Sequence, residues 1–218
     1  MLLVAWLGVL CAVGVAAHDD FVIEPEFAKV TIGSSIKLTH LISDYKLHSH
    51  AVAYGSGSHQ QSVTAFPEAD SSDSYFLVSG IAKEISGDAI KCGSTVQLKH
   101  LSTKKWLHSH DHEAPLSTNR EVSAYDGLDT GNHWIVHCRQ KGASYWMREQ
   151  PIALKHVDSG RFLSASKAHV FRDPISGHLE VSCIPDDRVE ALWVAQEGIY
   201  LGDRSYADDA KTEKHDEL

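Results

Sequence analysis

Signatures of catalysis and of nucleic-acid binding are missing from this chain of 218 residues. It has no G-x-S-x-G turn, H-E-x-x-H pair, glycine-rich phosphate loop or C-x-x-C pair, which excludes the common hydrolase, metalloprotease, nucleotide-binding and disulfide-exchange motifs. Its 29 acidic residues outnumber its 20 lysines and arginines, and the net charge is −9. A nucleic-acid partner is not expected, because such partners require a basic surface. We predict neither an enzyme nor a cofactor.

Long apolar segments are also missing, apart from one at the N-terminus. Residues 1–17 carry no charge and end in Val15-Ala16-Ala17, which is typical of a secretory signal peptide; a buried N-terminal helix is the alternative. No later stretch is long and apolar enough to span a bilayer. The chain ends in the endoplasmic-reticulum retrieval signal His215-Asp216-Glu217-Leu218, and the polar residues 203–218 predict a flexible tail that presents it. Together these two ends predict a protein of the endoplasmic-reticulum lumen.

A phrase of fifteen residues occurs three times in the chain. Residues 36–50, 96–110 and 152–166 align without a gap. Their histidines, His40, His100 and His156, are 60 and 56 residues apart, and the valines of a second shared phrase, Val63, Val122 and Val181, are 59 residues apart. Self-similarity at a fixed period is the mark of a repeat architecture, in which no unit buries its apolar face alone.

The repeats have the alternating pattern of half-buried strands. In the first copy Ile36, Leu38 and His40 alternate with polar residues, and turn-rich stretches separate such segments. About four short strands per unit, in units at about 33–80, 93–138 and 149–198, predict an all-β fold. A propeller typically needs at least four blades, so three units favour a closed β-trefoil over residues 18–202. We expect a strand over residues 21–32 to meet residues 198–201 where the chain ends come together.

The repeated histidines and leucines are predicted to face the core. Each histidine is expected to bond a nearby carbonyl or hydroxyl group; convergence of the three on a zinc ion is the less favoured alternative. This core set comprises His40, His100, His156, Leu47, Leu107 and Leu163. The outer pairs have H-x-H spacing, which suits a metal, but we interpret them as solvated. These pairs are His48/His50 and His108/His110, with His112 beyond the second. No metal site is predicted.

Cysteine is scarce, with four in the chain, of which Cys11 lies in the signal peptide. Cys92 precedes the first strand of the second unit and Cys138 follows its last, so the two are close if the ends of that unit meet. The lumen permits disulfides, and we predict one between Cys92 and Cys138. Cys183 occupies the repeat position of Ala65 and Ala124, which predicts a small, buried, free thiol.

The repeated L-x-H-L…L-H-S-H phrase, followed by Y-G-S-G-S-H-Q-Q-S-V-T at residues 54–64, resembles the MIR domain. Residues 105–124, K-W-L-H-S-H-D-H-E-A-P-L-S-T-N-R-E-V-S-A, are similar to the stromal cell-derived factor 2 group of that family. The resemblance covers roughly residues 19–202 and implies a β-trefoil of three MIR motifs. It also implies partners in the endoplasmic reticulum: a lumenal J-domain co-chaperone, an Hsp70-type chaperone and misfolded client proteins. Related MIR domains in protein O-mannosyltransferases suggest a link to O-mannosyl glycans or a mannosyltransferase. The third unit departs from the phrase, with Ser164-Ala165-Ser166 in place of H-S-H.

Two loops are the predicted contact surfaces for a partner or ligand. The first is interpreted as a flexible polar loop whose glycines allow close backbone approach. Its candidate residues are Tyr54, Gly55, Ser56, Gly57, Ser58, Gln60 and Gln61, and those of the second loop are Asp111, His112 and Asn119. Trp106 and Phe162 share a repeat position and are expected either to cap the barrel or to anchor a partner. The acids Glu121, Asp126 and Asp129 are interpreted as solvated loop residues.

These observations predict a non-catalytic adaptor or co-chaperone of the endoplasmic-reticulum lumen. A carbohydrate-binding module for O-mannosyl glycans is the alternative. An enzyme is the third hypothesis. The Q-x-W motif of ricin-type sugar-binding trefoils is absent, and so is the H-P-D tripeptide, so the chain is not itself a J-domain protein.

Overall fold

The computed structural model of the chain describes residues 22–206. The predicted signal peptide and the retrieval signal therefore lie outside the described residues. Twelve strands and four short 3-10 helices make up the described part. Almost no other regular structure occurs there, as the alternating sequence pattern predicts.

Each unit supplies four strands in chain order. The first contains β1 (Ser35–His40), β2 (Lys46–Ala53), β3 (Gln61–Phe66) and β4 (Phe76–Gly80). The second contains β5 (Thr95–His100), β6 (Trp106–Glu113), β7 (Arg120–Tyr125) and β8 (Trp134–Cys138). The third contains β9 (Pro151–His156), β10 (Phe162–Val170), β11 (Leu179–Ile184) and β12 (Leu192–Ile199). The 3-10 helices are η1 (Pro25–Phe27), η2 (Ser72–Ser74), η3 (Thr130–Asn132) and η4 (Val189–Ala191).

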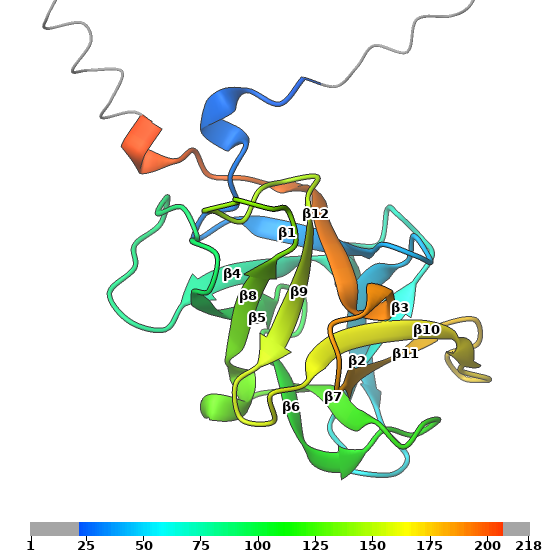
Figure 1. Cartoon of the computed structure of the whole chain (residues 1–218). Helices are drawn as coiled ribbons and strands as arrows, with labels where there is room; N and C mark the ends of the chain where they lie inside the picture. Colours follow the sequence, from blue (N-terminus) through cyan, green and yellow to red (C-terminus); the bar gives the residue numbers. More distant parts are fainter. Residues whose placement is uncertain (1–21, 207–218) are drawn as a thin grey trace, which may run out of the picture.

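The strand pairing is that of a β-trefoil. The first and last strands of the units pair in the closed antiparallel ring β1-β4-β5-β8-β9-β12, which forms a six-stranded barrel. The middle strands form the hairpins β2–β3, β6–β7 and β10–β11, and β3, β7 and β11 pair with one another around the pseudo-threefold axis. Figure 1 shows β6 and β7 at the end of the barrel opposite the two ends of the described chain. The predicted all-β trefoil is confirmed.

The register places the repeated histidines against the aromatic residues at the first or second position of the last strands. His40 lies opposite Trp193, and the same pairing joins Phe76 to His100 and Trp134 to His156. The ring centroids are 5.0, 5.2 and 5.0 Å apart. Leu47, Leu107 and Leu163 are 0% exposed and belong to the same core cluster. A unit cut from this ring loses the neighbours that cover its apolar side chains.

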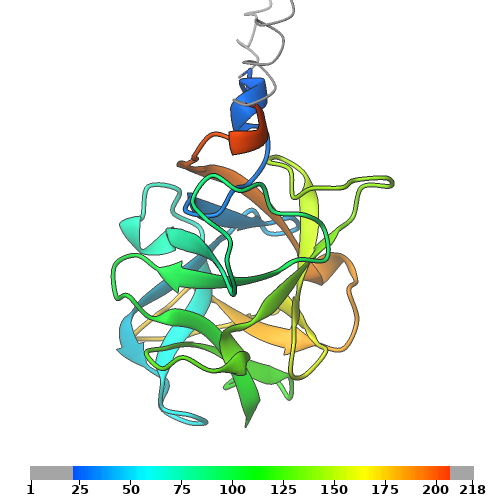
Figure 2. The ribbon, with the colours of Figure 1, turned by 90° about the vertical axis from the view of Figure 1, so that its left-hand side faces the viewer.

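The two ends of the described chain lie side by side, as Figures 1 and 2 show. The described part of the expected strand over residues 21–32, residues 22–32, is not a strand. It holds η1 and two isolated bridges, because its backbone partners are separate turns rather than one neighbouring strand. The hydroxyl of Thr31 donates to the carbonyl oxygen of Leu201 at 2.8 Å. Asp203, predicted to begin the tail, is instead 4% exposed, with its carboxylate 2.5 Å from Nζ of Lys29. The domain therefore extends beyond residue 202.

A disulfide joins Cys92 to Cys138, whose Cα atoms are 5.6 Å apart. It ties together the two ends of the second unit. Cys183 is free and buried, and burial raises the pKa of its thiol to about 12. No helix among residues 22–206 is long and apolar enough to cross a membrane.

Trp106 and Phe162 lie on the outer side of their strands, away from the leucines that follow them. Phe162 is 9% exposed and packs with Ala153, Ile184 and Ala191 in a second, small apolar cluster. Trp106 is half-buried, and Nζ of Lys99 lies 4.9 Å from its ring centroid. Both rings therefore cover the outside of the barrel wall.

Candidate functional site

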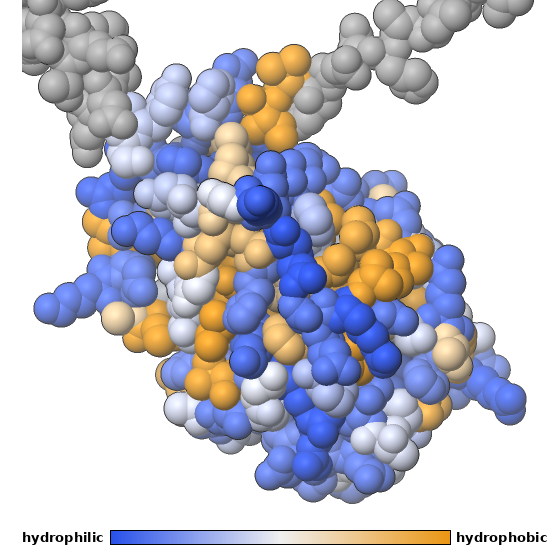
Figure 3. Space-filling model, viewed as in Figure 1, coloured by the Kyte–Doolittle hydropathy of each residue, from blue (hydrophilic) through white to orange (hydrophobic). Residues whose placement is uncertain are grey.

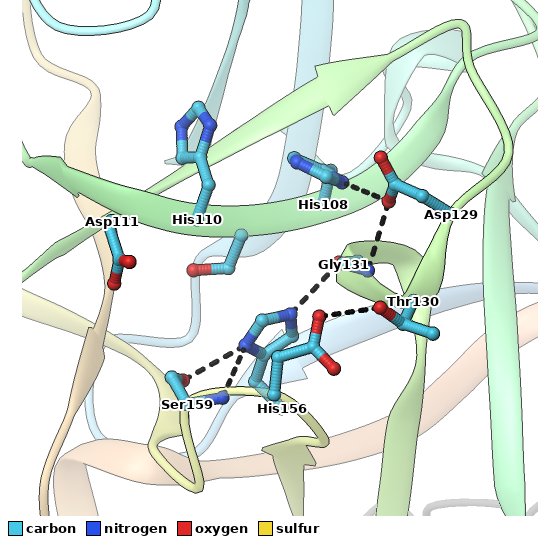
Figure 4. Close-up of a pocket in the computed structure, with 10 residues that line it drawn as sticks. His108, His110, Asp111, Asp129, Thr130, Gly131, His156 and Ser159 are labelled. Carbon is cyan, nitrogen blue, oxygen red and sulfur yellow. Dashed lines mark hydrogen bonds and ion pairs between the residues drawn. The ribbon is translucent and has the colours of Figure 1, made fainter.

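A pocket of about 390 Å³ lies between the second and third units. It is lined by β6, by η3 and the residue before it, and by the turn between β9 and β10 (Figure 4). Oδ1 of Asp129 accepts a hydrogen bond from the Gly131 backbone at 2.9 Å and lies 3.5 Å from Nδ1 of His108. Oδ2 of Asp158 accepts a hydrogen bond from the Thr130 hydroxyl at 2.8 Å. We call this the His108 pocket; it is open and polar, and it presents carboxylates, hydroxyls and imidazoles.

Close packing shapes the wall of the His108 pocket. A Cβ atom on Gly131 would lie 2.3 Å from Cε1 of His108 and 2.9 Å from the carbonyl oxygen of Ser109, so only glycine fits there. Nδ1 of His108 lies 3.0 Å from the side-chain oxygen of Asn132. Burial lowers the pKa of His108 despite that hydrogen bond and the nearby Asp129. The imidazole is therefore neutral at neutral pH and able to exchange hydrogen bonds with a neutral ligand. Asp129 is exposed, in agreement with its interpretation as a solvated acid, and it also caps η3, because its side chain accepts from the Gly131 backbone.

His156 and Ser159 in this pocket resemble a serine–histidine pair, with 2.9 Å between Nδ1 and Oγ. Nε2 of His156, however, lies 3.0 Å from the carbonyl oxygen of Gly131. A carbonyl oxygen only accepts, so Nε2 carries the proton and Nδ1 accepts from the serine hydroxyl. Burial, the largest influence, lowers the pKa of His156. Both ring nitrogens are thus engaged in hydrogen bonds inside the protein.

The same arrangement recurs in the other two units. Nδ1 of His40 lies 2.8 Å from the Ser43 hydroxyl, and Nδ1 of His100 lies 2.8 Å from the Thr103 hydroxyl. Their Nε2 atoms bond the carbonyl oxygens of Glu190 and Asp73. The three histidines do not converge on one point: among the described residues, none of them belongs to a group spaced to hold a metal ion. Three copies of one arrangement, each closing a turn, indicate a structural role.

The first predicted contact loop is held firmly rather than flexible. Tyr54 is 5% exposed, and its hydroxyl lies 2.8 Å from the carbonyl oxygen of Val63 and 3.0 Å from that of Val122. Gln61 is also 5% exposed, because its amide donates to the hydroxyls of Ser49 and Thr103. These two predicted ligand residues are therefore buried. They were misassigned because their partners are distant in sequence.

A buried carboxylate of the second unit secures this loop. Glu121 is 0% exposed; it accepts hydrogen bonds from the Ser58 hydroxyl and backbone, and lies 3.0 Å from Nε2 of His110. Burial alone would raise the pKa of Glu121, but the bonds from His110 and Ser58 outweigh it and hold that pKa below its usual value. The interpretation of Glu121 as a solvated loop acid was wrong, because the loop of another unit covers it. Gln60 adds a further contact by accepting from the Ser123 hydroxyl at 2.6 Å.

The second predicted loop is secured in the same way to the third unit. Glu180, 1% exposed, stands at the repeat position of Glu121 and accepts from the Leu116 backbone and the Ser117 hydroxyl. Asn119 donates to the Ser182 hydroxyl at 3.2 Å. Asp111 and His112 remain exposed at the end of β6, and so do Gly55, Ser56 and Gly57 at the tip of the first loop. These five exposed residues form what we call the hairpin-end surface.

At the remaining interface, between the third unit and the first, three histidines lie together. They are His48 and His50 of β2 and His178, the residue before β11. His178 was not among the residues singled out from the sequence. The repeat alignment carries the signal that would have found it, because His178 occupies the position of Gln60 and Asn119, which reach into the next unit.

The chain matches known proteins over most of its length. The family model described as the MIR domain matches residues 47–128. The "Stromal cell-derived factor 2-like protein" of Arabidopsis thaliana is 41% identical over 181 residues, which cover 81% of this chain and 82% of that protein. Human "Stromal cell-derived factor 2" is 39% identical over 177 residues, covering 79% of this chain and 82% of that protein.

Solved structures agree with these matches. The crystal structure of the SDF2-like protein from Arabidopsis thaliana has a TM-score of 0.78 and 40% identity, covering 81% of this chain and 99% of that one. A chain in the S. cerevisiae protein O-mannosyltransferase Pmt1-Pmt2 complex bound to the sugar donor has a TM-score of 0.73 and 25% identity. That match covers 87% of this chain and 30% of the yeast chain. The match thus covers most of this chain and a minor part of the yeast chain.

Proposed function

This chain belongs to the stromal cell-derived factor 2 family of MIR-domain proteins, and we propose that it is a non-catalytic adaptor of the endoplasmic-reticulum lumen. In this role it binds a J-domain co-chaperone and, with it, an Hsp70-type chaperone that acts on misfolded proteins. The observation that carries the proposal is the similarity to that family over four fifths of the chain, with 41% identity to the plant relative. The terminal sequences described above support the lumenal location.

The placement of the reactive groups supports binding rather than catalysis. His40, His100 and His156 use both ring nitrogens within the protein, and their pKa values are lowered chiefly by burial. The free thiol of Cys183 is 0% exposed. A nucleophile or general base has to reach its substrate, and these groups do not.

The hairpin-end surface is the proposed contact for the co-chaperone. Its residues stand on loops that Glu121 and Glu180 hold from beneath, so little conformational entropy is lost when a partner binds. A rigid scaffold that presents exposed loops is a common arrangement for recognition. Figure 3 shows a mainly hydrophilic face with separate apolar patches, which suits a reversible complex more than an obligate one.

Binding of a purified lumenal J-domain co-chaperone to the mature chain tests this proposal. We expect Asp111→Ala with His112→Ala to weaken the affinity measured by calorimetry, without changing the melting temperature. Lys141→Ala is the matched control, because Lys141 is exposed in the turn after β8. The mature chain is expected to suppress aggregation of an unfolded client poorly alone and better with the co-chaperone. Normal binding by the double variant would place the contact elsewhere, and no binding by the wild type would contradict the adaptor role.

The location has a separate test. Removing residues 215–218 is expected to send the protein into the medium of expressing cells without changing its melting temperature, because the described domain ends before them. Retention of the shortened chain in the cell would count against receptor-mediated retrieval.

A carbohydrate-binding role is the second candidate, and the His108 pocket favours it. Neutral imidazole, carboxylate and hydroxyl groups around an open polar pocket are suited to hydrogen-bond sugar hydroxyls. A similar trefoil occurs within a yeast O-mannosyltransferase complex. Titration with an O-mannosyl peptide tests this candidate: chemical-shift changes at Asp158 and Thr130 that disappear in Asp158→Asn would support it. Unchanged spectra at millimolar glycan would exclude it.

A further inference from the structure

The three histidines between the third and first units form a compact cluster. One ring nitrogen of each of His48, His50 and His178 lies within 4.8 Å of the others. The ring centroids are 5.2, 5.2 and 5.4 Å apart. Phe66 stacks on His178 at 4.2 Å and closes one side with an apolar wall. We call these three residues the histidine cluster.

Hydroxyl groups orient two of the three rings. Nδ1 of His48 lies 3.2 Å from the Ser74 hydroxyl, and Nδ1 of His178 lies 2.8 Å from the Thr64 hydroxyl. Within residues 22–206, no hydrogen bond engages Nε2 of either ring. Metal-binding histidines commonly have this arrangement, in which an outer partner bonds one nitrogen and the other keeps its lone pair for the metal.

The third interface lacks the carboxylate that closes the other two. Glu121 and Glu180 occupy the second position of β7 and β11, whereas the same position of β3 is Ser62. The Ser62 hydroxyl is buried and has no partner among the described residues. The loop of the third unit is therefore not bound by an acid of the first, and the histidine cluster lies at this interface instead.

We propose that His48, His50 and His178 bind a zinc ion that links the third unit to the first. Three imidazole ligands with one open coordination position are an established zinc arrangement. Nitrogen ligands also bind copper(II) and nickel(II), which makes the donor set selective for divalent transition metals over calcium or magnesium. The bound ion closes the third interface as the two carboxylates close the others.

The geometry requires a small closing movement. Tetrahedral zinc with Zn–N distances of about 2.0–2.1 Å places its nitrogen ligands about 3.3 Å apart. His50 can supply the movement, because it is half-buried and no hydrogen bond in the described part of the chain restrains its ring. Burial, with smaller contributions from the neighbouring histidines, lowers the pKa of His48 to about 3 and that of His178 to about 4, so both rings present neutral nitrogen.

Metal titration of the chelator-treated mature chain tests the proposal. Zinc measured by calorimetry is expected to bind with a stoichiometry of one and to raise the melting temperature. Cobalt(II) is expected to give the intense visible absorption of a tetrahedral site. His178→Ala should lower the zinc affinity at least about 100-fold. Loss of a residue that only bonds a metal ligand already lowers metal affinity up to about 100-fold, and loss of a ligand should cost no less. His50→Ala should lower the zinc affinity to a similar extent. It also provides a test if His178→Ala fails to fold, because no hydrogen bond within the described residues holds the His50 ring and its loss should leave the fold intact.

His112→Ala is the matched control, because His110 and His112 form an H-x-H pair with ring centroids 4.8 Å apart in the second unit. This variant should bind zinc like the wild type. Loss of binding in His112→Ala would assign the ion to the second unit and overturn the proposal. Unchanged binding in His50→Ala, or no saturable binding in the wild type, would overturn it equally.

Discussion

The interface between the first and second units and the one between the third and first units are related by the pseudo-threefold axis, yet different chemistry closes them. At the first, Glu121 receives hydrogen bonds from Ser58 and His110. At the interface between the third and first units, Ser62 takes the place of the acid, and its hydroxyl has no hydrogen-bond partner among the described residues. The trefoil therefore preserves the strand pairing around its axis while the polar contacts beneath each loop vary.

The difference also explains why the outer histidines diverge. His110 has a carboxylate partner, so its ring is directed to Glu121. The equivalent His50 has only the short side chain of Ser62 at that place, and its ring lies beside His48 and His178. In the second unit His108 bonds the side chain of Asn132. The third unit has neither residue, because Ser164 stands at the position of His108 and the buried Ala191 at that of Asn132. In the third unit the histidine and its hydrogen-bond partner are thus both absent, whereas in the first unit His50 is present without a carboxylate partner.

The largest expected effect is that of Glu121→Ala compared with Ser62→Ala. Removing the carboxylate leaves the Ser58 and His110 groups unpaired beneath the loop, which costs about 3 kcal/mol of unfolding free energy. Ser62→Ala should stay within about 0.5 kcal/mol of the wild type, because its hydroxyl has no partner to lose. Urea denaturation measures both. Equal effects would show that the two interfaces are closed alike.

Gly57→Ala tests how closely the loop covers Glu121. Gly57 has φ +68°, and a Cβ there would lie 2.1 Å from Oε2 of Glu121. We expect the unfolding free energy to fall by about 1–2 kcal/mol, because a left-handed backbone is unfavourable for a residue with a Cβ and this Cβ would also contact the carboxylate. Gly55→Ala is the control, with no atom within 4 Å of its added Cβ, and should be nearly neutral in the same urea series. A neutral Gly57→Ala would mean that the loop moves away from the acid.

The strand pattern and the core were predictable because their signals are local. Alternation around His40 is read from neighbouring residues, and two further copies of the pattern identify the closed ring. A three-unit repeat leaves few architectures, so the trefoil followed. The buried position of Leu47 followed from the same alternation, because successive side chains of a strand point to opposite faces.

The candidate site was less predictable because its contacts cross between units. Tyr54 lies in a stretch rich in glycine and serine, and its buried hydroxyl bonds Val122 of the next unit as well as Val63 of its own. Glu121 is likewise covered by a residue distant in sequence, since Ser58, which bonds it, lies 63 residues away. Asp203 was placed in the tail by composition, whereas its ion pair with Lys29 spans 174 residues. Composition describes a solvated segment correctly only when no distant partner covers it.

Asn119→Ala sharpens the comparison at the interface between the second and third units. The Asn119 amide donates to the Ser182 hydroxyl, as Gln60 and His178 bond hydroxyls at the other two interfaces. Loss of this half-buried bond should cost about 1 kcal/mol. Thr118→Ala, at the exposed neighbouring position, should be neutral within about 0.5 kcal/mol. A cost for Thr118→Ala equal to that of Asn119→Ala would show that the loop backbone, and not this bond, is being measured.

The smallest expected effect is a change in acid sensitivity, and it is specific to the first interface. The folded pKa of Glu121 lies below its ordinary value of 4.5, so its stabilising contribution is complete above that value and is lost as the pH falls through the folded pKa. The groups that face it are His110 and Ser58. One carboxyl exchanges at most one proton, which limits the slope to about 1.4 kcal/mol per pH unit. Glu121→Gln removes this titration, so its urea midpoint should fall less steeply than that of the wild type between about pH 5 and pH 3. Ser62→Ala, which changes no titrating group, should keep the wild-type slope. If Glu121→Gln also keeps it, the carboxylate is not held in its ionised form by the loop, and the two interfaces differ in shape alone.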